Sequence, residues 1–382
     1  MDTPSPHKLP FATAKAPTTS LYVNLKAVKN NWHKLNDLSD SACQTGAVIK
    51  ANSYGMGMEA VSMALYKAGC RLFFTARIDE AHHLLDIFDK FAFTDAKIIV
   101  FDGVQEGHEA YFHHPSLIPA LNDQAQIERA RFIAKQNDRA TPCFIHIDTG
   151  MSRLGLPLQE WQNIKNSDGL DSLDIQMIMS HLASADLPNS PQNKLQLSAF
   201  QNALDGTNYK ASFANSGGVF LGKEYHFDVA RPGLALYGLS PDKSDQNLEM
   251  AFRWTADILQ IRDIQKGMSV GYGGGFIAEK DMKLATIGVG YADGFLRRSQ
   301  QAVFMRIEGT DCPLIGRVSM DSCVVDISSL TQQQIEKATK AIIIDDAISA
   351  HELADRTDTI IYEVMTILGE RVMRHYDDED AI

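Results

Sequence analysis

The segment Ala47-Val-Ile-Lys-Ala-Asn-Ser-Tyr-Gly-Met-Gly57 places an apolar, β-prone run directly before a polar, glycine-rich turn. Lys50 stands at the end of that run. In a (β/α)8 barrel, catalytic residues lie where the strands end and the loops to the helices begin. A lysine that emerges from an apolar strand loses hydration, which lowers its pKa toward a nucleophilic range. The alternative for this residue alone is a lysine whose side chain extends from the strand end into solvent.

Short apolar runs alternate with longer amphipathic stretches on both sides of this segment, from about Leu21 to Gly238. The strand candidates are Ala47–Lys50, Leu72–Thr75, Lys97–Phe101, Cys143–Asp148, Ile175–His181, Ala211–Asn215 and Leu234–Tyr237. The helix candidates are Ala27–Leu38, Met58–Ala68, Ile78–Phe88 and Asp123–Lys135. Strands that alternate with helices indicate a parallel sheet. The size of the region favours a (β/α)8 TIM-type barrel over its structural alternative, a doubly wound sheet.

After Pro241 the sequence becomes rich in strand-like runs separated by glycine-rich turns. These runs are Phe252–Ile261, Leu284–Val289, Val303–Ile307, Cys323–Ile327 and Ala341–Ile344. Leu330–Thr339 and Ile360–Met373 are the helix candidates of this part. The pattern predicts a mostly β domain. We therefore expect an α/β protein with a flexible lead-in over residues 1–19, a barrel over 20–240 and a C-terminal β domain over 241–382.

Composition excludes several classes of function. The net charge of −12 argues against a nucleic-acid surface or an anionic membrane as partner. The five cysteines are scattered without a CxxC pair, which indicates reduced thiols rather than a disulfide framework or a zinc site. We find neither an apolar run of bilayer length nor a signal peptide in the first twenty residues. We expect a soluble, cytoplasmic protein without a metal.

Two further strand ends carry candidate binding residues. Arg153 follows the run Cys143–Asp148, and an arginine there can hold a carboxylate by two parallel hydrogen bonds. An ion pair between Arg153 and Asp148 is the alternative. His181 ends another apolar run, where its ring suits stacking on a flat cofactor. A histidine with satisfied hydrogen bonds in the core is the other possibility.

Two late loops have the composition of an anion site. Ala214-Asn-Ser-Gly-Gly218 contains Asn215, Ser216 and two glycines, and backbone N–H groups in such a turn can bind an anion together with the Ser216 hydroxyl. A plain turn would use the same residues. Arg231 is followed by Gly233 and Leu234, whose N–H groups could also meet a phosphate. TIM-type barrels often bind phosphate at these late loops.

Together these motifs resemble the alanine racemase family, which joins an N-terminal pyridoxal-phosphate-binding barrel to a C-terminal β domain. The resemblance runs from about Ser20 to Tyr376. Nine motifs occur in the family's order: AVIKANSYG, DTGMSRLG, SHLASAD, ANSGG, ARPGLALYG, SVGYGGGF, VGYADGF, GRVSMD and YEVMTILGERVMRHY.

The resemblance implies a role for each site residue. Lys50 would carry pyridoxal 5'-phosphate covalently and act as the base for the D-amino acid. Tyr272 would be the base for the L-amino acid and would come from the second subunit of a homodimer. Arg231 would hydrogen-bond the pyridine nitrogen, and His181 would flank the ring. The other cofactor-binding residues would be Tyr54, Asn215, Ser216, Gly233, Leu234 and Tyr362. The substrate would meet Arg153, the backbone of Met320 and, near the entrance, Tyr291.

The chemistry of racemisation needs such a set of residues. The α-proton is removed from one face of a planar carbanion and returned to the other, which favours two bases on opposite sides. Lysine and tyrosine both have unperturbed pKa values near 10, so the site must lower both. An arginine at the pyridine nitrogen discourages protonation of that nitrogen. We expect this to favour return of the proton to the substrate's α-carbon over side reactions such as transamination. The implied function is interconversion of L- and D-alanine, with D-alanine supplied for peptidoglycan.

Three positions depart from the family's pattern. His146 stands where members commonly carry a lysine, often carbamylated, that orients the carboxylate-binding arginine. Met56 replaces a usual histidine, and Ser319 a frequent cysteine. These changes leave a broad-specificity or serine-preferring racemase as an alternative. A non-catalytic pyridoxal-phosphate-binding protein on a similar barrel would lack the C-terminal β domain. The related decarboxylases usually carry a catalytic cysteine and a His-Val-Gly-Ser-Gly-type phosphate loop, and we find neither at the corresponding positions.

Overall fold

The computed structural model describes residues 18–39, 41–299 and 303–377. Residues 1–17 of the predicted lead-in lie outside this part of the chain. The chain forms two compact units. The first, which we call the barrel unit, comprises Tyr22–Arg253, Ile344–Ile367 and Arg374–Ile382. The second, the β unit, comprises Met1–Leu21, Trp254–Ile343 and Leu368–Met373.

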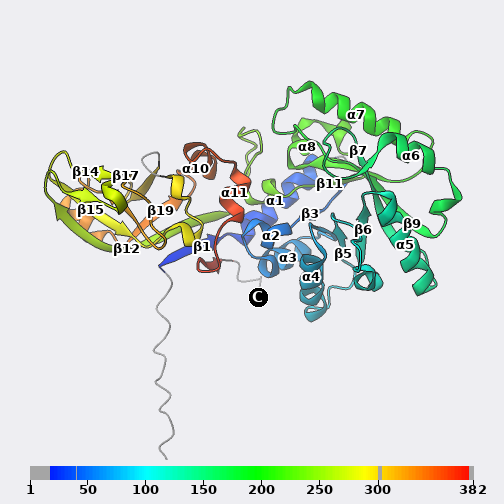
Figure 1. The fold of residues 1–382 in the computed structure, drawn as a ribbon, viewed down its shortest axis with the longest axis horizontal. Helices are drawn as coiled ribbons and strands as arrows, with labels where there is room; N and C mark the ends of the chain where they lie inside the picture. Colours follow the sequence, from blue (N-terminus) through cyan, green and yellow to red (C-terminus); the bar gives the residue numbers. More distant parts are fainter. Residues whose placement is uncertain (1–17, 40, 300–302, 378–382) are drawn as a thin grey trace, which may run out of the picture. The chain divides into compact units, whose positions relative to one another are not determined.

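The barrel unit is built on a parallel sheet in the order β2-β11-β10-β9-β7-β6-β5-β4-β3, with β8 beside β7 (Figure 1). The strands are β2 (Gln44–Thr45), β3 (Ala47–Val48), β4 (Leu72–Thr75), β5 (Lys97–Val100), β6 (Leu117–Leu121), β7 (Thr141–Asp148), β8 (Leu156–Pro157), β9 (Leu173–Met179), β10 (Ala211–Asn215) and β11 (Val229–Arg231).

One interrupted strand brings the two ends of this sheet together. β2 and β3 are separated only by Gly46, and they pair with β11 on one side and β4 on the other. The N–H of Gly46 donates to the Ala230 carbonyl (2.9 Å) and that of Val48 to the Pro232 carbonyl (2.8 Å). The sheet is therefore a nearly closed parallel barrel, which confirms the predicted fold class.

Helices pack around these strands: α1 (Leu25–Leu38), α3 (Met58–Lys67), α4 (Ile78–Lys90), α5 (Gln124–Asn137), α6 (Leu158–Ile164), α7 (Pro191–Leu204) and α8 (Ser216–Leu221) (Figure 1). Side-chain caps fix where several of them begin. Asn24 accepts the Ala27 N–H at the start of α1, and Asp123 accepts the Gln126 N–H at the start of α5. The described helices include none that is long and apolar enough to cross a membrane.

One expected element in the barrel was wrong, and one strand was not expected. Leu234–Tyr237 is a 3-10 helix, η4, and not a strand, because a short buried apolar run suits either structure. The strand that precedes it is β11. In addition, the strand β6 was missed. It contains Pro119, and a proline normally argues against an interior strand.

The strands of the β unit belong to a second, mostly antiparallel sheet in the order β15-β18-β17-β16-β19-β12-β1-β20. Its strands are β1 (Thr19–Val23), β12 (Phe252–Ile264), β15 (Met282–Ile287), β16 (Phe304–Ile307), β17 (Thr310–Ile315), β18 (Cys323–Asp326), β19 (Lys340–Ile344) and β20 (Met373–Tyr376). A separate hairpin joins β13 (Ser269–Val270) to β14 (Phe276–Ile277). The predicted β character of this part is confirmed.

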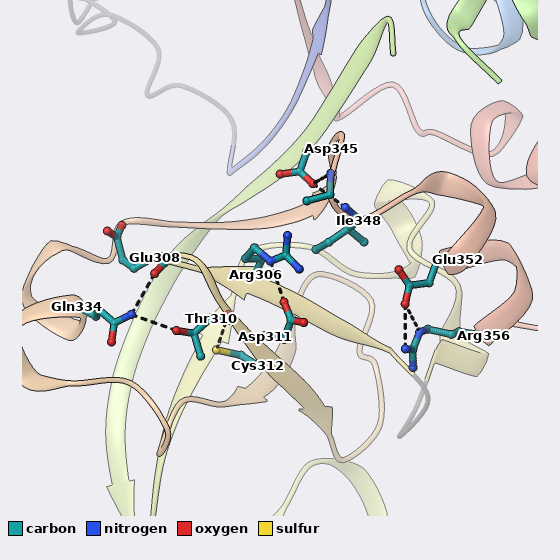
Figure 2. A network of polar contacts seen from close by, with 11 residues as sticks. Arg306, Glu308, Thr310, Asp311, Cys312, Gln334, Asp345, Ile348, Glu352 and Arg356 are labelled. Carbon is teal, nitrogen blue, oxygen red and sulfur yellow. Dashed lines mark hydrogen bonds and ion pairs between the residues drawn. The ribbon is translucent and has the colours of Figure 1, made fainter. Parts of the chain in front are cut away.

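Polar side chains tie the β16–β17 hairpin together (Figure 2). The amide of Gln334 on α9 (Gln332–Lys337) donates to the Glu308 carbonyl and to Thr310 Oγ1, both at 3.0 Å. Arg306 Nε donates to Asp311 Oδ1 across the two strands (2.8 Å). Two helices belong to the barrel unit rather than to this one, α10 (Ala350–Arg356) and α11 (Ile361–Thr366), and α11 is shorter than the predicted helix Ile360–Met373.

We predict that Gly46→Ala weakens closure of the barrel. A Cβ on residue 46 would lie 2.7 Å from the Phe74 ring and 2.9 Å from the Leu72 carbonyl, so β4 would have to shift. We expect the free energy of unfolding to fall by about 1–3 kcal/mol in urea denaturation. Gly169→Ala is the control, because its Cβ would approach only the tip of the Ser167 side chain. Equal effects of the two substitutions would contradict this account of Gly46.

Candidate active site

Lys50 follows β3 and opens a turn of unusual backbone conformation, α2 (Lys50–Tyr54). The next four residues, Ala51 to Tyr54, all have φ between 52° and 55°. This is a left-handed helical turn, which costs about 1–2 kcal/mol for each residue that carries a Cβ. Such a turn persists only when its surroundings hold it, and backbone strain of this kind concentrates at functional sites.

Hydrogen bonds from other elements hold this turn. The N–H of Ala51 donates to Glu80 Oε1 of α4 (2.6 Å), and Asn52 Oδ1 accepts the Met58 N–H (2.7 Å). Arg374 Nε donates to the Gly55 carbonyl (2.6 Å), and the Tyr376 hydroxyl donates to that of Met56 (3.1 Å). These contacts fix the direction in which Lys50 leaves the strand. Sequence reasoning did not find Glu80, Arg374 or Tyr376, because their partners are backbone groups.

A cavity of about 590 Å³ lies at the ends of the barrel strands and is within the usual size of a cofactor site. All of its lining residues belong to the barrel unit. Nine predicted site residues line it: Lys50, Tyr54, Arg153, His181, Asn215, Ser216, Arg231, Gly233 and Tyr362. Leu234 is buried immediately after Gly233. The other three predicted residues, Tyr272, Tyr291 and Met320, belong to the β unit.

The Lys50 amine lies in an environment that favours its neutral form. Burial is the main cause that lowers its pKa, and the charge of Arg153 adds to this effect. Glu80 and Asp102 act in the opposite direction but do not cancel the shift. The physical basis is that a partly buried cation loses hydration and gains repulsion from a second cation. The prediction of a lysine with a lowered pKa at this strand end agrees with this environment.

Arg231 is a buried cation whose hydrogen-bond partners are neutral. Its guanidinium donates to the Ser212 hydroxyl and to the carbonyls of Ser180 (2.6 Å) and Phe213 (3.5 Å). Burial lowers its pKa to about 9, so it stays protonated at neutral pH. Burial and nearby cations, Arg231 first among them, hold the pKa of His181 well below its usual range. His181 is therefore a neutral ring beside a fixed charge.

The loops after β10 and β11 contain the residues of the predicted anion site. Ser216 Oγ accepts hydrogen bonds from the N–H groups of Gly233 (2.9 Å) and Ala235 (3.2 Å), which leaves its own proton free to donate. Asn215 Oδ1 accepts the Gly218 N–H (3.0 Å). A Cβ on residue 233 would lie 2.2 Å from the Tyr54 hydroxyl, so a glycine is required there. The Gly233 N–H, proposed for the phosphate, already donates to Ser216 Oγ of the neighbouring loop.

Arg153 lines the cavity with an exposed side chain. The carboxylate of Asp148 instead accepts the N–H groups of Gly150, Met151 and Ser152. Among the described residues no carboxylate pairs with Arg153. The alternative, an ion pair between Arg153 and Asp148, therefore does not form. An arginine without an ion pair at the wall of a cavity can bind the carboxylate of a ligand.

His146 is buried and neutral. Its Nδ1 lies 2.8 Å from Asn122 Oδ1. Asn122 Nδ2 donates to the carbonyls of Phe101 and Ala120, so its Oδ1 is the acceptor and His146 Nδ1 carries the proton. Burial and the charges of Arg231 and Arg153 lower the pKa of His146 to about 3. This position therefore supplies no negative charge to Arg153.

The candidate residues of the β unit are accessible to solvent. Tyr272 begins the short turn η5 (Tyr272–Gly274) between β13 and β14, and 72% of its surface is exposed. Tyr291 is 43% and Met320 52% exposed. These three side chains are therefore available to contact another molecule.

Models of two domains match almost the whole chain. The alanine racemase N-terminal domain matches residues 23–241, and the alanine racemase C-terminal domain matches residues 251–376. The chain belongs to the alanine racemase family. Among curated family members, the alanine racemase of Rhodospirillum rubrum is 38% identical over 362 residues, covering 94% of this chain and 96% of its own. That of Brucella canis is 37% identical over 372 residues, covering 93% of each.

Solved structures of family members have the same fold. The alanine racemase of Bartonella henselae, with covalently bound pyridoxal phosphate, is 34% identical with a TM-score of 0.88 and covers 94% of this chain and 99% of its own. The biosynthetic alanine racemase of Pseudomonas aeruginosa is 28% identical with a TM-score of 0.82, covering 95% and 100%. The predicted family is thus confirmed over both of its domains.

We predict that Ala51→Gly stabilises the protein. Glycine adopts the left-handed conformation without the steric cost that the Ala51 Cβ meets at φ 52°. After allowance for the greater entropy of a glycine in the unfolded chain, we expect a gain of roughly 0.5–1 kcal/mol. Ala199→Gly, within the regular helix α7, should instead lower the free energy of unfolding. Urea denaturation of both variants checks this, and destabilisation by Ala51→Gly would contradict it.

Proposed function

We propose that this chain interconverts L- and D-alanine with pyridoxal 5'-phosphate as cofactor, by a two-base mechanism that supplies D-alanine for peptidoglycan in the cytoplasm. The enzyme is an isomerase of the alanine racemase family. The observation that carries the proposal is the cavity, which gathers a lysine of lowered pKa and two arginines that pair with no carboxylate in the described part of the chain. Such a cavity suits a ligand that is anionic at more than one place.

The residues of the cavity fit the cofactor. Its phosphate would be held by hydroxyl donors, because Ser216 has a free proton and burial raises the pKa of Tyr54 well above its usual range, which keeps the phenol protonated. The other phosphate-side residues would be Asn215, Gly233, Leu234 and Tyr362. Arg231 would donate to the pyridine nitrogen and His181 would flank the ring. When bound, the cofactor withdraws electrons from the substrate's α-carbon and makes its proton acidic.

The chain's own residues move the proton and hold the substrate. Lys50 would bind the cofactor covalently, and its Nζ would remove and return the α-proton of the D-enantiomer. The Tyr272 hydroxyl would do the same for the L-enantiomer from the opposite face. Arg153 would hold the substrate carboxylate by paired hydrogen bonds.

We also propose a homodimer in which Tyr272 reaches the cavity of the second copy, accompanied by Met320 and Tyr291. The exposure of these three side chains supports this arrangement, since an isolated subunit leaves them in solvent. The domain boundaries proposed are a barrel over 20–240 and a C-terminal domain over 241–382. The partners proposed are an amino acid and a second copy, without a metal, nucleic acid or membrane.

A broad-specificity or serine-preferring racemase is the second candidate function. His146 favours it, because a neutral ring replaces the anion that commonly orients the carboxylate-binding arginine. Rates of racemisation of alanine, serine and lysine by the purified enzyme with added pyridoxal phosphate separate the two. We expect alanine to be preferred. Bound cofactor without alanine turnover would move the function to another amino acid or another reaction of this cofactor.

We predict that Lys50→Ala abolishes both racemisation and covalent attachment of the cofactor. The variant lacks the amine that attaches the cofactor and returns the D-side proton. Racemisation is followed by circular dichroism of alanine, and attachment by visible absorbance after gel filtration. Lys194→Ala, on the exposed face of α7, is the control and should retain both properties. Covalent cofactor in the Lys50 variant would assign the attachment to another residue.

Tyr272→Phe should separate the two proton transfers. Loss of one acid–base group is expected to lower racemisation roughly 10²–10⁴-fold. Lys50 remains, so D-alanine should still exchange its α-hydrogen with D2O without inversion, as measured by NMR. Cofactor binding should be unchanged, and Tyr111→Phe, outside the cavity, should behave like the parent. Racemisation of both enantiomers at the parental rate would disprove the two-base assignment.

A further inference from the structure

Three segments of the β unit meet at the guanidinium of Arg371. Its Nε and Nη2 donate to the two carboxylate oxygens of Asp293, at 2.9 and 3.1 Å. Its Nη1 donates to Asp321 Oδ1 at 2.7 Å. Arg371 thus joins the segment 368–373 to the turn around Tyr291 and to the loop that contains Met320. The planar fork of an arginine can hold two carboxylates in this way, whereas the ammonium of a lysine cannot.

Asp293 is the buried member of this network, with 2% of its side chain exposed, whereas that of Asp321 is 65% exposed. Asp293 Oδ2 also accepts the Gly290 N–H (2.8 Å), which closes the short turn η6 (Tyr291–Asp293). The Asp293 carbonyl accepts the Gly369 N–H (3.1 Å). A buried carboxylate needs such partners, because a charge left unpaired away from water is costly.

The turn and the loop that Arg371 connects are also bonded directly to each other. The N–H of Tyr291 donates to the Ser319 carbonyl (3.1 Å) and that of Ala292 to the Met320 carbonyl (3.0 Å). Gly290 makes this close approach possible, since a Cβ there would lie 2.2 Å from the Met320 carbonyl oxygen. These hydrogen bonds therefore hold the backbone of Tyr291 and that of Met320 together as one piece.

This piece presents groups that are free to bind a ligand. The N–H of Met320 has no acceptor in the part of the chain that the structure describes, although its carbonyl is bonded. We infer that Arg371 is a positioning residue for the substrate. It sets the orientation in which the Met320 N–H and the Tyr291 ring meet alanine. This inference rests on the proposed function, which assigns both residues to the substrate.

The experiment compares Arg371→Lys with Arg306→Lys. Both substitutions remove an arginine fork from an Arg–Asp pair of the β unit, but Arg306 bridges the β16–β17 hairpin (Figure 2), which contains neither Tyr291 nor Met320. Steady-state rates with L-alanine give kcat and KM, and inhibition by propionate, which is alanine without its amino group, gives Ki. We expect Arg371→Lys to raise KM and the propionate Ki roughly 10-fold together. Arg306→Lys should leave both unchanged.

Asp321→Asn provides a second, milder variant. Asp321 is exposed, so its substitution should not prevent folding, and it releases only the Met320 loop from Arg371. We expect a rise in KM and Ki of the same sign, with Asp311→Asn as the matched control. Because Arg371 and Asp321 share one contact, KM and Ki of the double variant should rise by less than the product of the two single effects.

Visible absorbance and thermal unfolding separate positioning from a merely structural role. If Arg371→Lys and Asp321→Asn lower only kcat, in proportion to the amount of folded enzyme with cofactor, the inference is overturned. Unchanged KM and Ki in both variants of an active parent would overturn it as well. An inactive parental enzyme would instead contradict the proposed function, and with it the inference.

Discussion

The pairing of the strand interrupted at Gly46 with β11 is the contact on which the rest of this structure depends. Backbone hydrogen bonds, among them those from Gly46 to Ala230 and from Val48 to Pro232, join the first strand of the barrel to the last. Because both strands end at the same edge, Lys50 and Arg231 line one cavity although they are far apart in the sequence. A Cβ at residue 46 would collide with β4. Barrel closure, and with it formation of the cavity, therefore depends on a glycine at this position.

Cationic side chains line the cavity, whereas the chain as a whole is negatively charged. The protein carries a net charge of −12, yet Lys50, Arg153 and Arg231 line one pocket, and neither arginine has a carboxylate partner in the described part of the chain. Burial and the charge of Arg153 weaken the cationic form of Lys50, and burial weakens that of Arg231. An anionic cofactor and the carboxylate of an amino acid would offset the positive charge gathered there. The lowered pKa of Lys50 and the proposed affinity of the site for anions thus have one physical origin.

Support for the site comes from residues remote in the sequence that act through backbone groups. Glu80, Arg374 and Tyr376 hold the left-handed turn after Lys50, and Arg371 joins the two loops of the β unit. At the turn after Lys50, these donors and acceptors offset a backbone conformation that residues with a Cβ disfavour. The tautomer of His146 also depends on a remote residue, because Asn122 determines which of its nitrogens carries the proton.

By itself, the sequence determined the alternation of strands and helices, the change to β structure after Pro241, and the residues at the strand ends, because periodicity and loop composition are local properties. It did not determine that Leu234–Tyr237 is a 3-10 helix, or that Pro119 lies within a strand, since neighbouring strands decide both. Only the tertiary structure decided that Arg153 has no ion pair with Asp148 and that His146 is neutral. Charge state and pairing depend on burial and on partners far along the chain, which no local pattern records.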